Sequence, residues 1–118
     1  MSYKSSTNKS ALGGISVIDL SRILAGPWAS QTLADLGAHV IKVERPQVGD
    51  DTRAWGPPFI NQGTEESQAA YFHCANRNKQ SIAIDITSDK GQQIIKDMVV
   101  KADVFIENYK VGGLKKYG

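Results

Sequence analysis

The chain has 118 residues, enough for one small domain with a hydrophobic core, and its 41% hydrophobic and 22% charged residues are typical of a globular protein. Fourteen basic and twelve acidic side chains give a formal net charge of +2, which gives no support for nucleic-acid binding, and no apolar run has the length of a membrane span. The single cysteine, Cys74, cannot form an internal disulfide, so we expect a cytoplasmic protein, or a mitochondrial or peroxisomal one in a eukaryote.

The two ends of the sequence differ from its middle. Residues 1–11 are polar and contain no apolar core, so we expect a flexible leader and not a secretory signal. At the other end, residues 115–118 follow a helix-like turn without a closing element. We therefore expect residues 12–118 to be a segment of a larger domain, truncated on its C-terminal side.

The first folded unit is predicted to be strand, helix, strand. Residues 15–20 and 39–43 are the two apolar strand candidates. Between them, Pro27 suits the first position of a helix and Gly37 suits the position just past its end. The helical spacing predicts one buried stripe, made of Ala29, Thr32, Leu33 and Leu36. Two strands that flank a helix of this length favour a right-handed parallel crossover.

A long segment without a regular pattern follows, from residue 46 to about residue 65. A loop of this length in a small domain is usually functional, and residues 50–53 and Trp55 are specific residue types rather than linker filler. We expect a short helix next, over about residues 66–75.

The second half repeats the architecture of the first. Residues 81–86 alternate strictly and predict the third strand, residues 87–89 predict a helix cap, and residues 103–107 predict the fourth strand. The order β-α-β, long loop, β-α-β predicts an α/β fold with an open parallel Rossmann-like sheet and helices on its faces.

An open α/β sheet binds ligands outside the carboxyl ends of its strands. There the sequence places the cations Arg45 and Lys110, the aromatic Tyr109, the amide Asn108, and a helix start behind the small residues 25 and 26. This collection suits an adenine nucleotide, because a helix start offers N–H donors to anions and a guanidinium pairs with phosphate or stacks on a purine. Each feature also has a structural alternative. Residues 26 and 27 then only mark the start of a helix, Arg45 is a solvated surface cation, and residues 108 and 109 form a simple turn with a packing aromatic ring.

Other kinds of site have less support. The turn after the first strand lacks the G-x-G-x-x-G pattern of a dinucleotide site. His39, His73 and Cys74 have no metal-ligand spacing, and no G-x-S-x-G elbow occurs. The basic turn at residues 76–79 precedes its strand, so we expect a structural or subunit-contact role for it at the opposite edge of the sheet.

Several motifs in the right order resemble the amino-terminal signature of the family III CoA-transferases, which include formyl-CoA transferase, carnitine CoA-transferase and the α-methylacyl-CoA racemases. They are residues 19–27 (DLSRILAGP), 33–38, 40–46, 49–53 (GDDTR), 76–79 and 107–109. The resemblance implies that coenzyme A lies along the sheet edge as a substrate and not as a permanently bound cofactor. Its implied contacts are Leu24, Ala25, Arg45, Ile84, Asp85, Ile86, Thr87, Asn108, Tyr109, Lys110 and Lys116.

The same resemblance implies transfer of CoA from an acyl-CoA donor such as succinyl-CoA to a small carboxylic acid such as glutarate. The nucleophilic aspartate of such enzymes is expected beyond Gly118, so we assign no catalytic residue here and expect this chain alone to be inactive. The full-length protein is expected to be an interlocked homodimer. A racemase of the same family and a non-catalytic CoA-binding fragment are the alternatives. Lys116 departs from the Arg that is usual in the family, and Val111 from the usual Pro.

Overall fold

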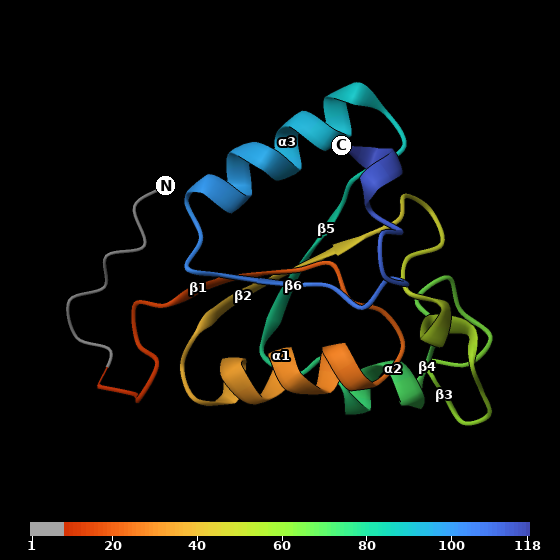
Figure 1. The fold of residues 1–118 in the computed structure, drawn as a ribbon. Coiled ribbons are helices and arrows are strands. Elements are labelled where there is room, and N and C mark those ends of the chain that lie inside the picture. Colours follow the sequence, from red (N-terminus) through yellow and green to blue (C-terminus); the bar gives the residue numbers. More distant parts are fainter. Residues whose placement is uncertain (1–8) are drawn as a thin grey trace.

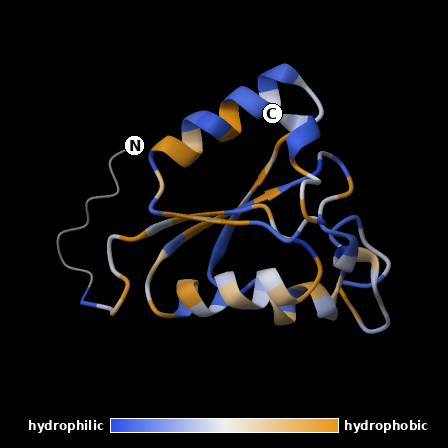
Figure 2. Ribbon diagram, in the orientation of Figure 1, coloured by the Kyte–Doolittle hydropathy of each residue, from blue (hydrophilic) through white to orange (hydrophobic). Residues whose placement is uncertain are grey.

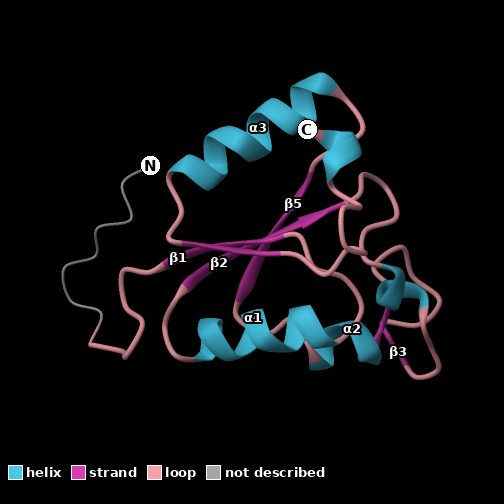
Figure 3. Ribbon diagram, in the orientation of Figure 1, coloured by secondary structure: helices cyan, strands magenta, loops and turns pink. Residues whose placement is uncertain are grey.

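The computed structural model describes residues 9–118; most of the predicted leader, residues 1–8, lies outside them. A four-stranded sheet lies between two helical layers (Figures 1 and 3). Helices α1 (Ala25–Asp35) and α2 (Ala70–Cys74) lie on one side of the sheet, and α3 (Asp89–Val100) lies on the other (Figure 1). The predicted α/β fold with helices on both faces is confirmed.

The sheet is parallel throughout and has the order β5-β2-β1-β6. Its strands are β1 (Ser16–Asp19), β2 (His39–Glu44), β5 (Lys79–Ala83) and β6 (Val104–Ile106). The chain steps outward from β1 through β2 to β5, and then returns to place β6 on the free side of β1. The direction of winding therefore reverses between β1 and β6, which is the topological switch point where such sheets bind ligands.

Alternate side chains of β1 serve the two sides of the sheet, because successive residues of a strand point to opposite faces. Val17 packs toward α1 with Val40 and Ala34, whereas Ile18 packs toward α3 with Val43 and Ile95. Figure 2 shows the hydrophobic residues of these central strands between the two helical layers. Burial on both faces explains why neighbouring residues of these strands, such as Val17 and Ile18, are both apolar.

Helix α1 differs from its predicted form in two respects. It begins at Ala25, so Pro27 is its third residue; this is tolerated because the first four N–H groups of a helix have no partner within it. The predicted stripe was wrong. The buried residues are Pro27, Ser30, Gln31 and Ala34, while Leu33 is only partly buried, Ala29 and Thr32 are exposed, and Leu36 is 46% exposed.

Hydrogen bonds explain why α1 turns this more polar face inward. The Ser30 hydroxyl donates to the Asp19 carboxylate. The Gln31 amide donates to the Cys74 carbonyl at 3.0 Å and accepts from the Arg77 N–H at 2.7 Å. Buried polar groups that have hydrogen-bond partners cost little free energy. These polar side chains therefore occupy the buried face of α1 in place of the residues that helical spacing favours. The predicted C-terminal stop is confirmed, because Gly37 adopts φ +103° just past the helix.

The long central segment is not structureless. A 3-10 helix, η1 (Asp51–Ala54), follows the end of β2, and β3 (Phe59–Ile60) pairs with β4 (Gln68–Ala69) as a small antiparallel sheet. The helix expected over residues 66–75 is confined to Ala70–Cys74, because β4 takes up the residues before it.

In the second half, the strand expected over residues 81–86 pairs with β2 as Lys79–Ala83 instead, from Val40 opposite Lys79 to Glu44 opposite Ala83. The predicted cap of α3 is confirmed: the Ser88 hydroxyl accepts from the Gly91 N–H at 3.0 Å. The 3-10 helix η2 (Lys115–Tyr117) follows β6 through a turn. None of the helices within residues 9–118 has both the length and the apolar character to cross a bilayer.

Candidate functional site

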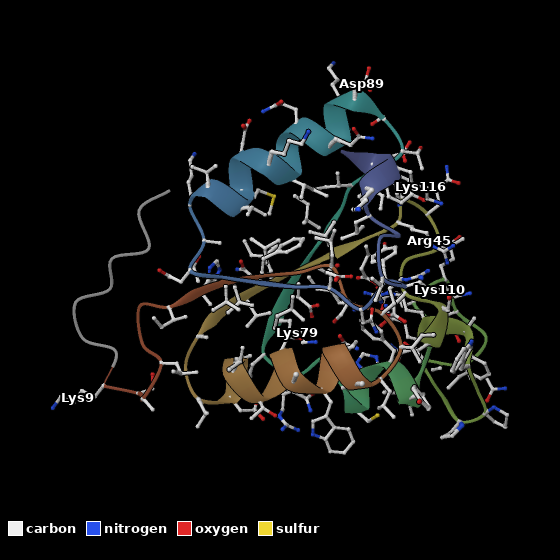
Figure 4. The ribbon with its side chains drawn as sticks, in the orientation of Figure 1. Lys9, Arg45, Lys79, Asp89, Lys110 and Lys116 are labelled. Carbon is white, nitrogen blue, oxygen red and sulfur yellow. The ribbon has the colours of Figure 1, made fainter. Side chains whose placement is uncertain are left out.

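The segments that follow the four parallel strands line one hollow of about 700 Å³ at the carboxyl edge of the sheet. Figure 4 shows Arg45, Lys110 and Lys116 on the same side of the molecule, whereas Lys79 lies toward α1. Nine residues predicted to contact CoA are among those that line the hollow: Arg45, Ile84, Asp85, Ile86, Thr87, Asn108, Tyr109, Lys110 and Lys116. The structure thus brings together residues that lie up to 71 positions apart in the sequence.

Two of the predicted residues do not line this hollow. Leu24 and Ala25 are exposed at the start of α1, beyond the end of β1. Five further lining residues were missed by the sequence analysis: Arg22, Pro46, Val48, Gly113 and Tyr117. Arg22 could have been found from the sequence alone, because a cation that closely follows the first strand lies at the ligand-binding edge of the sheet.

The hollow is electropositive. Four cations line it, Arg22, Arg45, Lys110 and Lys116, against the single carboxylate of Asp85. That carboxylate is engaged locally, since it accepts from the Thr87 N–H at 2.9 Å and from the Thr87 hydroxyl at 2.6 Å. These hydrogen bonds from Thr87 lower the pKa of Asp85, so it is ionised at neutral pH. An anionic ligand is therefore favoured, and the apolar side chains of Val48, Ile84 and Ile86 offer contacts to a ring system.

Arg45 is held by its own loop. Its guanidinium forms an ion pair with Asp51 of η1, and its side chain remains 49% exposed. An exposed pair of this kind contributes little to stability, so the guanidinium can exchange Asp51 for a ligand phosphate at small cost. The arrangement fits a ligand contact better than a structural tie.

Asn108 joins the ends of β6 and β1. Its side-chain oxygen accepts from the Arg22 N–H at 2.9 Å, and its side-chain nitrogen donates to the Arg22 carbonyl at 2.7 Å. The Arg22 guanidinium lies 4.9 Å from the centre of the Tyr109 ring, within the range of a cation–π contact. Burial raises the pKa of Tyr109, and Arg22 and Arg45 oppose that shift, so the phenol stays neutral at physiological pH.

A buried ion pair between Lys42 and Asp50 lies next to the carboxyl edge of the sheet. The Lys42 ammonium lies 2.9 Å from the Asp50 carboxylate and 2.9 Å from the Ser21 carbonyl, and both side chains are almost completely buried. Asp50 also accepts from the N–H and hydroxyl of Thr52 and from the Ile23 N–H. Burial opposes ionisation of Asp50, but the hydrogen bonds from Lys42 and Thr52 outweigh it and lower its pKa. The pair ties the segment after β2 to the segment after β1.

Glu44 and Arg53 form a second tie within the same loop. Arg53 donates to both oxygens of Glu44, at 2.8 and 2.7 Å, and the Asp50 N–H donates to Glu44 at 2.8 Å. Burial opposes ionisation of Glu44, yet these bonds and one from Ser81 leave its pKa below the ordinary value. Residues 50–53, which the sequence marked as specific, therefore shape the loop at the hollow; Trp55 instead packs edge-on against Tyr71.

The basic turn at residues 76–79 is engaged within the chain. The Lys79 ammonium contacts Asp19 at 3.3 Å, the Pro27 carbonyl at 2.8 Å and the Ala75 carbonyl at 3.0 Å, while Arg77 pairs with Asp35. Burial lowers the pKa of Lys79 to about 8, with Asp19 opposing the shift. These contacts support the structural role that we predicted.

Gly26 is explained by packing rather than by ligand approach. A Cβ atom placed there would lie 2.3 Å from the Ser21 Cβ, which is closer than atoms can approach. The glycine therefore lets the start of α1 lie against the loop that leaves β1.

Two other hollows of the described chain differ from this one. One of about 280 Å³ is also lined by cations, Lys42, Arg53 and Lys79, but Lys42 and Arg53 are paired with Asp50 and Glu44, and Lys79 with Asp19. A hollow of about 400 Å³ under α3 is lined mainly by apolar side chains, with Lys96 as its only charged side chain. Within residues 9–118, no three His, Cys, Asp or Glu side chains are grouped closely enough to hold a metal ion.

Comparison with known proteins places these features in a family. The family model described as CoA-transferase family III matches residues 12–118. A succinate–glutarate CoA-transferase from Agrobacterium fabrum is 56% identical over 111 residues, which are 93% of this chain and 28% of that protein. The human succinyl-CoA:glutarate CoA-transferase is 53% identical over 111 residues, 94% of this chain and 24% of the relative.

Solved structures agree with the sequence matches. The crystal structure of a CAIB/BAIF family protein from Brucella suis superposes with a TM-score of 0.85 and 57% identity, over 92% of this chain and 28% of that one. The chain thus spans about a quarter of the length of the relatives that it matches.

Proposed function

Because this chain belongs to CoA-transferase family III, we propose that the hollow at the carboxyl edge of its sheet binds the CoA portion of an acyl-CoA substrate. The observation that carries the proposal is the convergence of four cations and apolar side chains on one hollow at the topological switch point. A nucleotide with several phosphates and a purine ring matches both the charge and the apolar contacts.

Most of the predicted contacts have a role in this proposal. Arg45 stacks on the purine or pairs with a phosphate, and Lys110 and Lys116 neutralise phosphate charge. Residues 84–87 supply one wall of the hollow, and Tyr109 supplies another. Leu24 and Ala25 lie outside the hollow, so a ligand reaches them only by extending along the strand ends toward α1.

We propose that the whole protein transfers CoA from a donor such as succinyl-CoA to a dicarboxylic acid such as glutarate. Support comes from the relatives named for succinate or succinyl-CoA and glutarate, at 56% and 53% identity. CoA enters in this scheme as one thioester and leaves as another, so it is a substrate. None of the aspartates of this chain matches the predicted nucleophile, and the catalytic carboxylate is assigned to the part of the relatives that this chain does not span.

A second function, CoA binding without catalysis, is favoured for this chain by itself. It spans about a quarter of its relatives, and exposed apolar side chains such as Trp28 (57%) and Val100 (85%) are of the kind that further protein would cover. We also propose that the full-length protein forms an interlocked homodimer.

Calorimetric titration with CoA tests the site. We expect binding by the wild-type chain and at least about tenfold weaker binding by Arg45→Ala, since a charge-assisted contact is lost. Lys101→Ala, which removes an exposed cation at the end of α3, is the matched control and should bind as wild type does. Equal affinity of wild type and Arg45→Ala would show that the ligand lies elsewhere.

Activity is tested separately, in a form that includes the remaining length of the relatives. Incubation with succinyl-CoA and glutarate should yield glutaryl-CoA and succinate, detected by mass spectrometry. The 118-residue chain by itself should bind CoA and yield none. Absence of exchange with any dicarboxylic acid in the longer form would contradict the transferase proposal while leaving the binding site intact.

A further inference from the structure

Arg22 stands at the innermost part of the ligand-binding edge. It lies three residues after the end of β1, on one side of the switch point, and it lines both the large hollow and a smaller one next to it. The Asn108 side chain fixes its backbone through two hydrogen bonds, of 2.9 and 2.7 Å. The guanidinium is therefore anchored at its base more firmly than a surface arginine.

The Arg22 guanidinium nevertheless has no polar partner among the residues that the structure describes. Within residues 9–118, its Nε is the one buried side-chain nitrogen or oxygen atom without a hydrogen bond. Its visible contact is the face of Tyr109, at 4.9 Å. A buried N–H group without a partner is costly, and in native proteins it calls for an explanation such as an absent ligand.

The neighbouring carboxylates do not supply that partner. Asp50 and Glu44 line the smaller hollow together with Arg22. Asp50 is already bound by Lys42 and Thr52, and Glu44 by Arg53 and Ser81. The positive charge of Arg22 is left for an anion that enters from the hollow.

We propose that Arg22 is a phosphate-binding residue of this site, whose guanidinium donates hydrogen bonds to a phosphate group of the bound nucleotide. The inference rests on the proposed CoA site and adds to it a residue that the family resemblance did not assign. The planar fork of arginine, packed here against Tyr109, offers N–H donors to two oxygens of one phosphate. CoA offers two sources of that chemistry, its pyrophosphate and its 3′-phosphate.

The test titrates wild type, Arg22→Gln and Arg22→Lys with CoA and with dephospho-CoA, which lacks the 3′-phosphate, at low and high salt. We expect Arg22→Gln to bind CoA about ten- to a hundredfold more weakly. Arg22→Lys keeps the charge but loses the fork, so its affinity should lie between the two. Lys101→Gln removes one exposed cation outside the hollow and should bind as wild type does.

Two readouts separate phosphate binding from a merely structural effect on Tyr109. Salt screens a charge–phosphate contact, so the affinity of Arg22→Gln should depend less on salt than that of wild type. If the loss persists with dephospho-CoA, the contact is to the pyrophosphate; if it disappears, the contact is to the 3′-phosphate. Either result supports phosphate binding by Arg22.

Three outcomes would overturn the inference. If wild type binds CoA and Arg22→Gln binds it with the same affinity, the inference about Arg22 is refuted and the proposed function stands. A loss of affinity with the salt dependence of wild type would assign Arg22 a structural role. Absence of CoA binding by the wild-type chain would refute both. Circular dichroism checks folding, and if Arg22→Gln does not fold, wild-type affinity in Arg22→Lys would refute the guanidinium contact.

Discussion

Asn108 holds both backbone polar groups of Arg22, although 86 positions separate the two residues in the sequence. The amide oxygen receives the Arg22 N–H and the amide nitrogen reaches its carbonyl, so one side chain joins the carboxyl ends of β1 and β6 at the switch point. The ligand-binding edge is therefore fixed by a side chain that the sequence marked as a ligand contact. Its amide is already used within the chain.

Replacement of Asn108 should loosen this edge. We expect Asn108→Ala to lower the free energy of unfolding by about 1 kcal/mol, because two hydrogen bonds at a partly solvated site are lost. Asn108→Asp keeps the acceptor for the Arg22 N–H and loses only the donor. Hydrogen exchange followed by NMR should show the Arg22 amide protected in wild type and Asn108→Asp, and unprotected in Asn108→Ala. Equal protection in all three would refute the clamp.

Gly26→Ala should destabilise the chain, contrary to helix propensity. Alanine favours an exposed helix position by up to about 1 kcal/mol over glycine. Here its Cβ would lie 2.3 Å from the Ser21 Cβ, and such overpacking costs about 1–3 kcal/mol. Urea unfolding should show the loss, and adding Ser21→Gly should recover part of it by removing the opposing atom. Because Ser21→Gly also removes a buried hydrogen bond to Asp19, the double variant is compared with Ser21→Gly alone. If Gly26→Ala costs as much in that background as in wild type, another contact is responsible.

Asp50→Ala should be among the most damaging single substitutions. It would leave the Lys42 ammonium buried without its carboxylate, and breaking a buried pair in this way costs about 3–5 kcal/mol. Asp35→Ala, which breaks the more exposed pair with Arg77, is the matched control and should cost much less. The unfolding midpoints in urea compare the two, and similar losses would contradict a supporting role for the Lys42–Asp50 pair.

The buried Lys79 should make stability depend on pH. Burial lowers its pKa to about 8 from an ordinary 10.5, so the unfolded chain binds more protons between these values. Stability contributed by this residue therefore rises as the pH is raised from about 8 to about 10.5. Lys79→Met lacks this titration, so the difference in free energy of unfolding between wild type and Lys79→Met should change across that range. A constant difference would show that the pKa of Lys79 is not lowered.

Much of the fold could be predicted because its signals are local. The apolar runs of β1 and β2, the Ser88 cap of α3 and the left-handed stop at Gly37 each depend on residues within one element. The buried face of α1 could not be predicted in this way. Its inward Ser30 and Gln31 are stabilised by Asp19, Cys74 and Arg77, which come from other elements.

The same distinction between local signals and contacts across the fold applies to the candidate site. The sequence by itself determined the fold class, the family resemblance and most of the residues around the hollow, because parallel strands bring their carboxyl ends to one edge. Only the tertiary structure decided what those residues do. It turned Asn108 into a clamp and placed the unpaired guanidinium of Arg22 against Tyr109. Hydrogen bonds and ion pairs across tens of residues depend on how elements pack, which local periodicity does not encode.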